Sequence, residues 1–67
     1  MINNYNLFFF IQNNLNTEVL QKIFTKDYKH YELKWISTNY NLLNFMNLLD
    51  ENNQNRLIEW GKKNYTN

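Results

Sequence analysis

The segment 38–60 has the clearest periodic pattern in this chain, and that pattern constrains the fold more than any other feature. Its apolar residues recur at spacings of three and four, which places them on one face of an α-helix. A polar break at residues 50–53 precedes a second apolar face, so the segment predicts two helices joined by a short turn. The first face consists of Leu42, Phe45, Met46 and Leu49, and the second of Leu57, Ile58 and Trp60.

The ends of these two helices follow from the residues that can cap them. Ser37 or Thr38 is expected to cap the first helix, which would run to about Leu49. The second would begin after the acidic residues of the break and run to about Trp60 or beyond. Gly61 then either ends that helix or is a small interior residue that lets two helices approach closely.

Two earlier segments favour β-strands. Residues 5–12 are apolar at nearly every position, which is typical of a short strand buried on both faces, although a helix over residues 5–15 is the competing interpretation. Residues 30–37 alternate, with Tyr31, Leu33 and Trp35 on one side, which predicts a half-buried strand. Between them, Asn16 or Thr17 is expected to cap a helix. Its apolar face would consist of Val19, Leu20, Ile23 and Phe24.

The expected order is therefore strand, helix, strand, helix, helix, in one small α+β domain over residues 1–67. The connection between the two strands contains a helix and has crossover length, so the two-stranded sheet is expected to be parallel. An all-α helical bundle is the alternative.

Catalytic and metal chemistry have little support in the sequence. The chain of 67 residues has no cysteine and a single histidine, His30, so disulfides and thiolate zinc sites are excluded. No carboxylate stands at a recognisable catalytic spacing, and no glycine-rich loop is present to bind phosphate. His30 is expected to be an ordinary surface residue. The sequence therefore predicts no metal, no cofactor and no enzymatic activity.

Association with another chain is the stronger expectation. A domain this short has a marginal core, and a two-stranded sheet leaves an open edge. The chain is rich in aromatic residues, which anchor many interfaces. A protein partner or a second copy is expected to cover the surplus apolar surface. The alternative is that these aromatics are ordinary, half-covered residues of the domain and contact no partner. The expected contact residues are Tyr40, on the asparagine side of its helix, Trp60 and Tyr65, near the chain end, and Phe8 and Phe10.

Nucleic-acid binding is a second hypothesis. The net charge is only +1, which argues against a general nucleic-acid binder. However, Lys22, Lys26 and Lys29 would share one helix face if their helix persisted that far, and Arg56 stands in the last helix. These side chains could contact phosphates in a small transcriptional regulator, and the aromatics could stack on single-stranded bases. A solvated helix face is the simpler interpretation of the lysines.

Composition also suggests an origin and a location. The chain contains fifteen asparagines but no alanine or proline, a bias typical of AT-rich codons. No apolar run approaches the roughly 20 residues of a membrane-spanning helix, and the N-terminus does not resemble a signal peptide. We expect a cytoplasmic protein, in the host cell if viral, without a membrane partner. A small phage or mobile-element protein that inhibits or adapts a host complex, such as a nuclease or CRISPR effector, fits this description.

Overall fold

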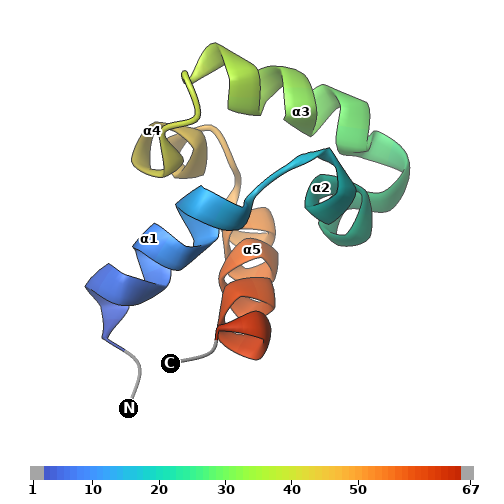
Figure 1. Ribbon diagram of the computed structural model, residues 1–67. Helices are drawn as coiled ribbons and strands as arrows, with labels where there is room; N and C mark the ends of the chain where they lie inside the picture. The colour runs from blue at the N-terminus through green and yellow to red at the C-terminus, as the bar shows by residue number, and fades with distance from the viewer. Residues whose placement is uncertain (1–2, 66–67) are drawn as a thin grey trace.

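The computed structural model describes residues 3–65, and over that range the chain consists of helices and short turns without a β-strand (Figure 1). The predicted α+β fold with its parallel two-stranded sheet is therefore wrong, and the all-α alternative is correct. The elements are α1 (Asn4–Asn14), α2 (Thr17–Phe24), a 3-10 turn η1 (Thr25–Asp27), α3 (Tyr28–Ser37), α4 (Leu42–Asn47) and α5 (Glu51–Asn64).

The first predicted strand is α1. Asn3 caps this helix, because its side-chain oxygen accepts a hydrogen bond from the backbone N–H of Tyr5 at 2.8 Å. A strand would have placed Leu7, Phe9 and Ile11 on one face. The helix instead buries Leu7 and Ile11, one turn apart, and leaves Phe9 51% exposed. The run was too uniformly apolar for its periodicity to distinguish the two conformations.

The second predicted strand lies within α3. Its alternating pattern required Leu33 to be buried beside Tyr31 and Trp35, but Leu33 is 68% exposed. The chain follows a helical spacing instead. The ring of Phe24 stacks on Tyr31 at a centroid distance of 4.0 Å, and Trp35 one turn further on is buried. Tyr31 and Trp35 are four residues apart, so the same residues fit a helix once Leu33 is allowed to face solvent.

The cap predicted at Asn16 is confirmed, because its side chain accepts from the backbone N–H of Val19 at 3.0 Å. However, α2 ends at Phe24. Thr25 has a positive φ of 45° and turns the chain into η1, from which α3 starts in a new direction. Lys22, in α2, is therefore not on a continuous helix with Lys26 and Lys29.

The helix predicted from Thr38 begins later, at Leu42. Residues 38–41 form a turn in which Asn39 and Tyr40 both have positive φ, 56° and 60°. The carbonyl of Trp35 accepts from the Thr38 hydroxyl at 2.7 Å and from the Tyr40 N–H at 3.2 Å, which closes the end of α3. Asn41 then caps α4 by accepting from the N–H of Asn44. The helix ends at Asn47, before Leu49, but the predicted apolar stripe is buried throughout, at Leu42, Phe45, Met46 and Leu49.

The last helix agrees best with its prediction. Asp50 caps α5 by accepting from the N–H of Asn53 at 2.9 Å, and the helix continues beyond Trp60 to Asn64. Gly61 is buried inside it and faces α1. Of its two predicted roles, the structure shows the small interior residue that permits close approach.

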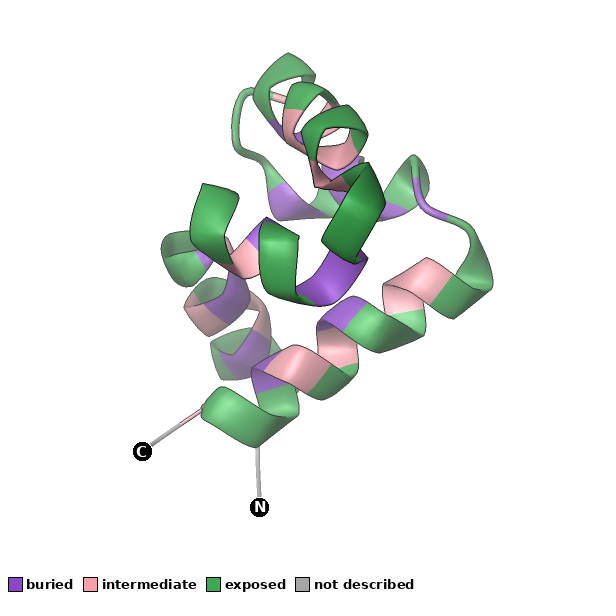
Figure 2. Ribbon diagram, turned by 90° about the vertical axis from the view of Figure 1, so that its right-hand side faces the viewer, coloured by how far each residue is buried: buried purple, intermediate pink, exposed green. Residues whose placement is uncertain are grey.

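The core lies where α1, α2, α4 and α5 face one another, with Trp35 of α3 added from one side. Figure 2 shows the buried segments gathered on the inner sides of the helices. The most deeply buried side chains come from all four of these helices: Ile11, Leu20, Leu42, Phe45 and Leu57. Within residues 3–65, no helix has both the length and the apolar character needed to cross a membrane.

Candidate functional site

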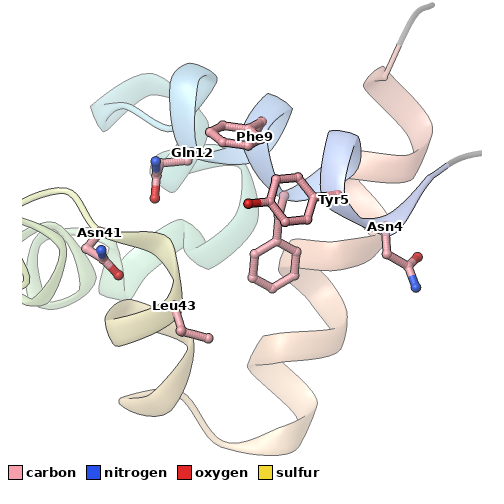
Figure 3. A pocket seen from close by; sticks show the side chains of 7 residues that line it. Asn4, Tyr5, Phe9, Gln12, Asn41 and Leu43 are labelled. Carbon is pink, nitrogen blue, oxygen red and sulfur yellow. The ribbon is translucent and has the colours of Figure 1, made fainter.

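An open groove of about 380 Å³ lies between α1 and the start of α4 (Figure 3). The backbones of the two helices lie side by side there (Figure 1). Its walls combine aromatic and aliphatic side chains with a rim of amides. The lining residues are Asn4, Tyr5, Phe8, Phe9, Gln12, Asn41 and Leu43.

One hydrogen bond fixes the two walls of the groove to each other. The side-chain oxygen of Gln12, in α1, accepts from the backbone N–H of Leu42 at 2.9 Å. This N–H is in the first turn of α4 and has no partner within its own helix. Leu42 itself is buried beneath it. The bond therefore sets the position of α4 against α1, and with it the width of the groove.

The apolar side chains of the groove are unusually open to solvent. Tyr5 is 71% exposed and Leu43 is 63% exposed, although both are large. Tyr5 and Phe9 lie one turn apart on α1, with ring centroids 5.3 Å apart, so the two rings form a continuous aromatic ridge along one wall (Figure 3). Leu43 lies across the groove on α4 (Figure 3). Phe8, by contrast, is partly buried and packs against the core.

The groove is formed by the two segments of the chain that carry no charged side chain. Residues 1–17 and 35–49 contain no Lys, Arg, His, Asp or Glu, so the 13 charged residues, 7 basic and 6 acidic, all lie in residues 18–34 and 50–63. In the structure these neutral segments supply α1 and α4, whereas α2, η1, α3 and α5 carry the charges. The α1–α4 face is therefore neutral and bears only amides, a phenol and apolar groups at the groove.

The predicted contact residues lie at three different places. Phe8 lines the groove. Phe10 packs against α5 instead, stacked on Trp60 with ring centroids 5.9 Å apart and edge-on to Tyr65 at 5.4 Å. These three rings are partly buried against one another. Trp60 and Tyr65 were predicted as contact residues because they are near the chain end. Their contact with Phe10 could not be predicted, because it requires α1 to be a helix.

Tyr40 lies apart from both groups. It is in the turn after α3 rather than on a helix, and it is 58% exposed, with its ring edge-on to Trp35 at 5.8 Å. It borders a smaller cleft of about 220 Å³ between α2 and α3. The Thr17 hydroxyl donates a hydrogen bond to Glu32 in that cleft, which ties the start of α2 to α3. The cleft is as polar as it is apolar and lacks the exposed aromatic ridge of the groove.

Sequence reasoning missed Tyr5, Phe9 and Leu43 as surface groups. Tyr5 and Phe9 fall in the segment predicted as a strand buried on both faces, where they would have been covered. A helical interpretation of the same run puts Leu7 and Ile11 on one face and Tyr5 and Phe9 on another, since each pair is four apart. Leu43 directly follows Leu42. Adjacent residues point in different directions on a helix, so the predicted helix could have shown that Leu43 lies off the buried face.

The basic residues do not form one surface. On the exposed side of α2, Lys22 Nζ lies 3.7 Å from Glu18 Oε1. Lys26 is in η1, and Lys29 is in the first turn of α3. Arg56 is exposed on α5. Lys62, on the same helix, lies 3.8 Å from Glu59. Such exposed ion pairs contribute little stability.

Nothing in the groove resembles a catalytic or metal site. Its lining residues have one ionisable group, the phenol of Tyr5. Among residues 3–65, no three His, Asp or Glu side chains come close enough to hold a metal ion. Comparison of the chain with protein-family models, with curated proteins and with solved structures found no match.

Proposed function

We propose that this protein is a non-enzymatic protein-interaction module and that the α1–α4 groove is its binding surface. The observation that carries the proposal is the exposed, apolar and uncharged lining of the groove. Contiguous exposed apolar surfaces in a concavity commonly mark sites of protein association. Tyr5 and Phe9 offer large contact areas in a concavity that the Gln12 hydrogen bond holds in shape.

The charge of the groove favours a protein over a nucleic acid as its occupant. A nucleic-acid site needs cationic groups that replace the counterions of the phosphates. The groove offers amides and aromatic rings instead, which suit an uncharged protein surface. Burial of this face costs little desolvation energy because no ion has to leave water.

The proposal also includes a biological setting for the protein. We place the module among small phage or mobile-element proteins that inhibit or adapt a host protein complex, such as a nuclease or a CRISPR effector. The asparagine-rich composition supports this assignment. A cytoplasmic location follows from it.

Photo-crosslinking tests the binding surface directly. A benzophenone side chain at position 9 is expected to crosslink to protein in extract of the source cells, because Phe9 lies in the groove and is half exposed. The matched control is position 33, where another exposed apolar side chain, Leu33, lies on α3, outside the groove. Phe9→Ala should weaken any captured complex by about tenfold, as truncation of an interface anchor does. Equal labelling from both positions, or none from position 9, would contradict the proposal.

A second candidate function is nucleic-acid binding by the α2–η1–α3 unit. The observation that favours it is geometric: two short helices are joined by a three-residue turn, and Lys29 and His30 are exposed at the start of the second helix. Helix-turn-helix proteins read DNA with this part of their second helix. The unit has four lysines against three acids in residues 18–34, a net charge of only +1, which is why we rank it second.

Charge reversal separates this candidate from the first. If the unit binds DNA or RNA, Lys26→Glu with Lys29→Glu should abolish a salt-sensitive complex, because both phosphate contacts become repulsive. Lys62→Glu with Lys63→Glu, on α5, makes the same change of charge away from the unit and should leave the complex intact. The measurement is fluorescence anisotropy of labelled DNA and RNA against salt concentration. If no complex forms at low salt, the second candidate fails.

A further inference from the structure

We infer that the occupant of the α1–α4 groove is a second copy of this chain, related to the first by a two-fold axis. The inference rests on the proposed function, because it names the partner of that same groove. It follows from the charge, the hydrogen-bonding groups and the shape of the face.

The face has no charged side chains, so it can meet a copy of itself without electrostatic repulsion. In a two-fold interface each patch meets the same patch of the other copy. A patch that carries net charge therefore places like charges against each other, which is destabilising. The segments that form α1 and α4 have no charged side chain, and every charge lies elsewhere in the chain. Two copies can therefore meet through this face without bringing like charges together.

The polar groups of the face are also complementary to themselves. Asn4, Gln12 and Asn41 border the groove. The side-chain oxygens of Gln12 and Asn41 each accept one hydrogen bond within the chain, which leaves each oxygen a second lone pair and each amide its NH₂ donors. Two identical rims of amides can therefore satisfy each other by hydrogen bonds. A rim of carboxylates or of lysines would lack this property, because it would present only acceptors or only donors.

The shape supplies the third argument. The aromatic ridge of Tyr5 and Phe9 stands beside the groove on the same face (Figure 3). A two-fold axis between ridge and groove lets each copy insert its ridge into the groove of the other. Both copies then bury the side chains that are most exposed here, namely Tyr5, Phe9 and Leu43. A domain of this size without disulfides gains stability from such burial.

Sedimentation equilibrium of the purified full chain tests the inference. The expected result is a species of two chains of 8.3 kDa that dissociates on dilution. Phe9→Glu and Leu43→Glu, one on each wall, should each raise the dimer dissociation constant by at least about tenfold, because a charge then has to be buried in each copy. Leu33→Glu makes the same change at an exposed apolar position outside the groove and should leave the constant unchanged. Circular dichroism checks that each variant folds.

The outcomes separate this inference from the function on which it rests. A monomer at every concentration, with position 9 crosslinked to a different protein, overturns the second copy as partner and keeps the interaction module. A monomer with no crosslink overturns both. A dimer that Leu33→Glu dissociates, while Phe9→Glu and Leu43→Glu do not, also overturns the inference, because association then uses the outer face of α3.

Discussion

Replacing Gly61 by leucine is expected to lower the free energy of unfolding by about 3 kcal/mol, although leucine is the better helix former. Gly61 lies in α5 at its contact with α1. A Cβ atom placed there would lie 2.5 Å from Cδ1 and 2.6 Å from Cγ1 of Ile11. Because both distances are far below van der Waals contact, α1 and α5 would have to separate.

The surrounding packing leaves Ile11 little room to yield. Ile11 is only 1% exposed, and Leu7 Cδ1 lies 3.3 Å from the same Cβ position. Gly61→Ala is expected to destabilise less, by about 1–2 kcal/mol, because the helix propensity of alanine offsets part of the clash. Adding Ile11→Val, which removes the nearest methyl group, should recover some of that loss.

Chemical denaturation measures both effects. The control is Asn55→Leu, which introduces the same side chain at an exposed position of the same helix and should change stability by less than about 0.5 kcal/mol. A Gly61→Ala variant that is more stable than the natural chain would show that α1 and α5 do not pack as closely as described.

This contact also shows which parts of the fold could be predicted from the sequence. Segment 38–60 does contain the two predicted helices, because its apolar residues repeat with one helical period, but the first runs from Leu42 to Asn47 and not from Thr38 to Leu49. The cap predicted at Asn16 is correct because it uses a local side-chain bond. The close approach at Gly61 was foreseen only as one of two roles. Which role it has depends on Ile11, fifty residues away, and no local pattern carries that information.

The two predicted strands failed for different reasons. Residues 5–12 have a single polar position inside the run, Asn6, which is too few to reveal a period, so a helix and a strand fit equally well. Residues 30–37 do alternate, but the decisive partner is Phe24, before the segment, whose ring stacks on Tyr31. Helical spacing becomes visible only when Tyr28 is included with Tyr31 and Trp35. The alternating residues 30–37 alone do not include Phe24 and Tyr28, so they cannot reveal this contact or this spacing.

The groove could not have been derived without the correct fold. Its two walls are about thirty residues apart in sequence and meet through one bond, from the Leu42 N–H to Gln12. The absence of charge in both wall segments was visible in the sequence, however. A neutral helix with apolar residues on two faces signals a second contact surface. Because α1 is a helix, one of its faces is covered by α5, and another face, with Tyr5 and Phe9, remains exposed.

Phe45→Ala is expected to lower the free energy of unfolding by about 3–5 kcal/mol. Phe45 is fully buried in α4 and meets Trp35 edge-on, with ring centroids 5.2 Å apart. A domain of this length has a total stability of roughly 3–10 kcal/mol, so the loss unfolds a large share of the molecules at room temperature. Thermal and urea denaturation, followed by circular dichroism, measure it.

The effect should be this large because α4 has only six residues. So short a helix does not form on its own propensity and depends on the packing of its apolar face. Leu43→Ala is the matched control: the same helix loses an apolar side chain, but an exposed one, so stability should change by less than about 0.5 kcal/mol. Leu43→Ala should still weaken association, because Leu43 is a wall of the groove. If both variants lost stability equally, α4 would not be held by Phe45, and the position of the groove wall would need another explanation.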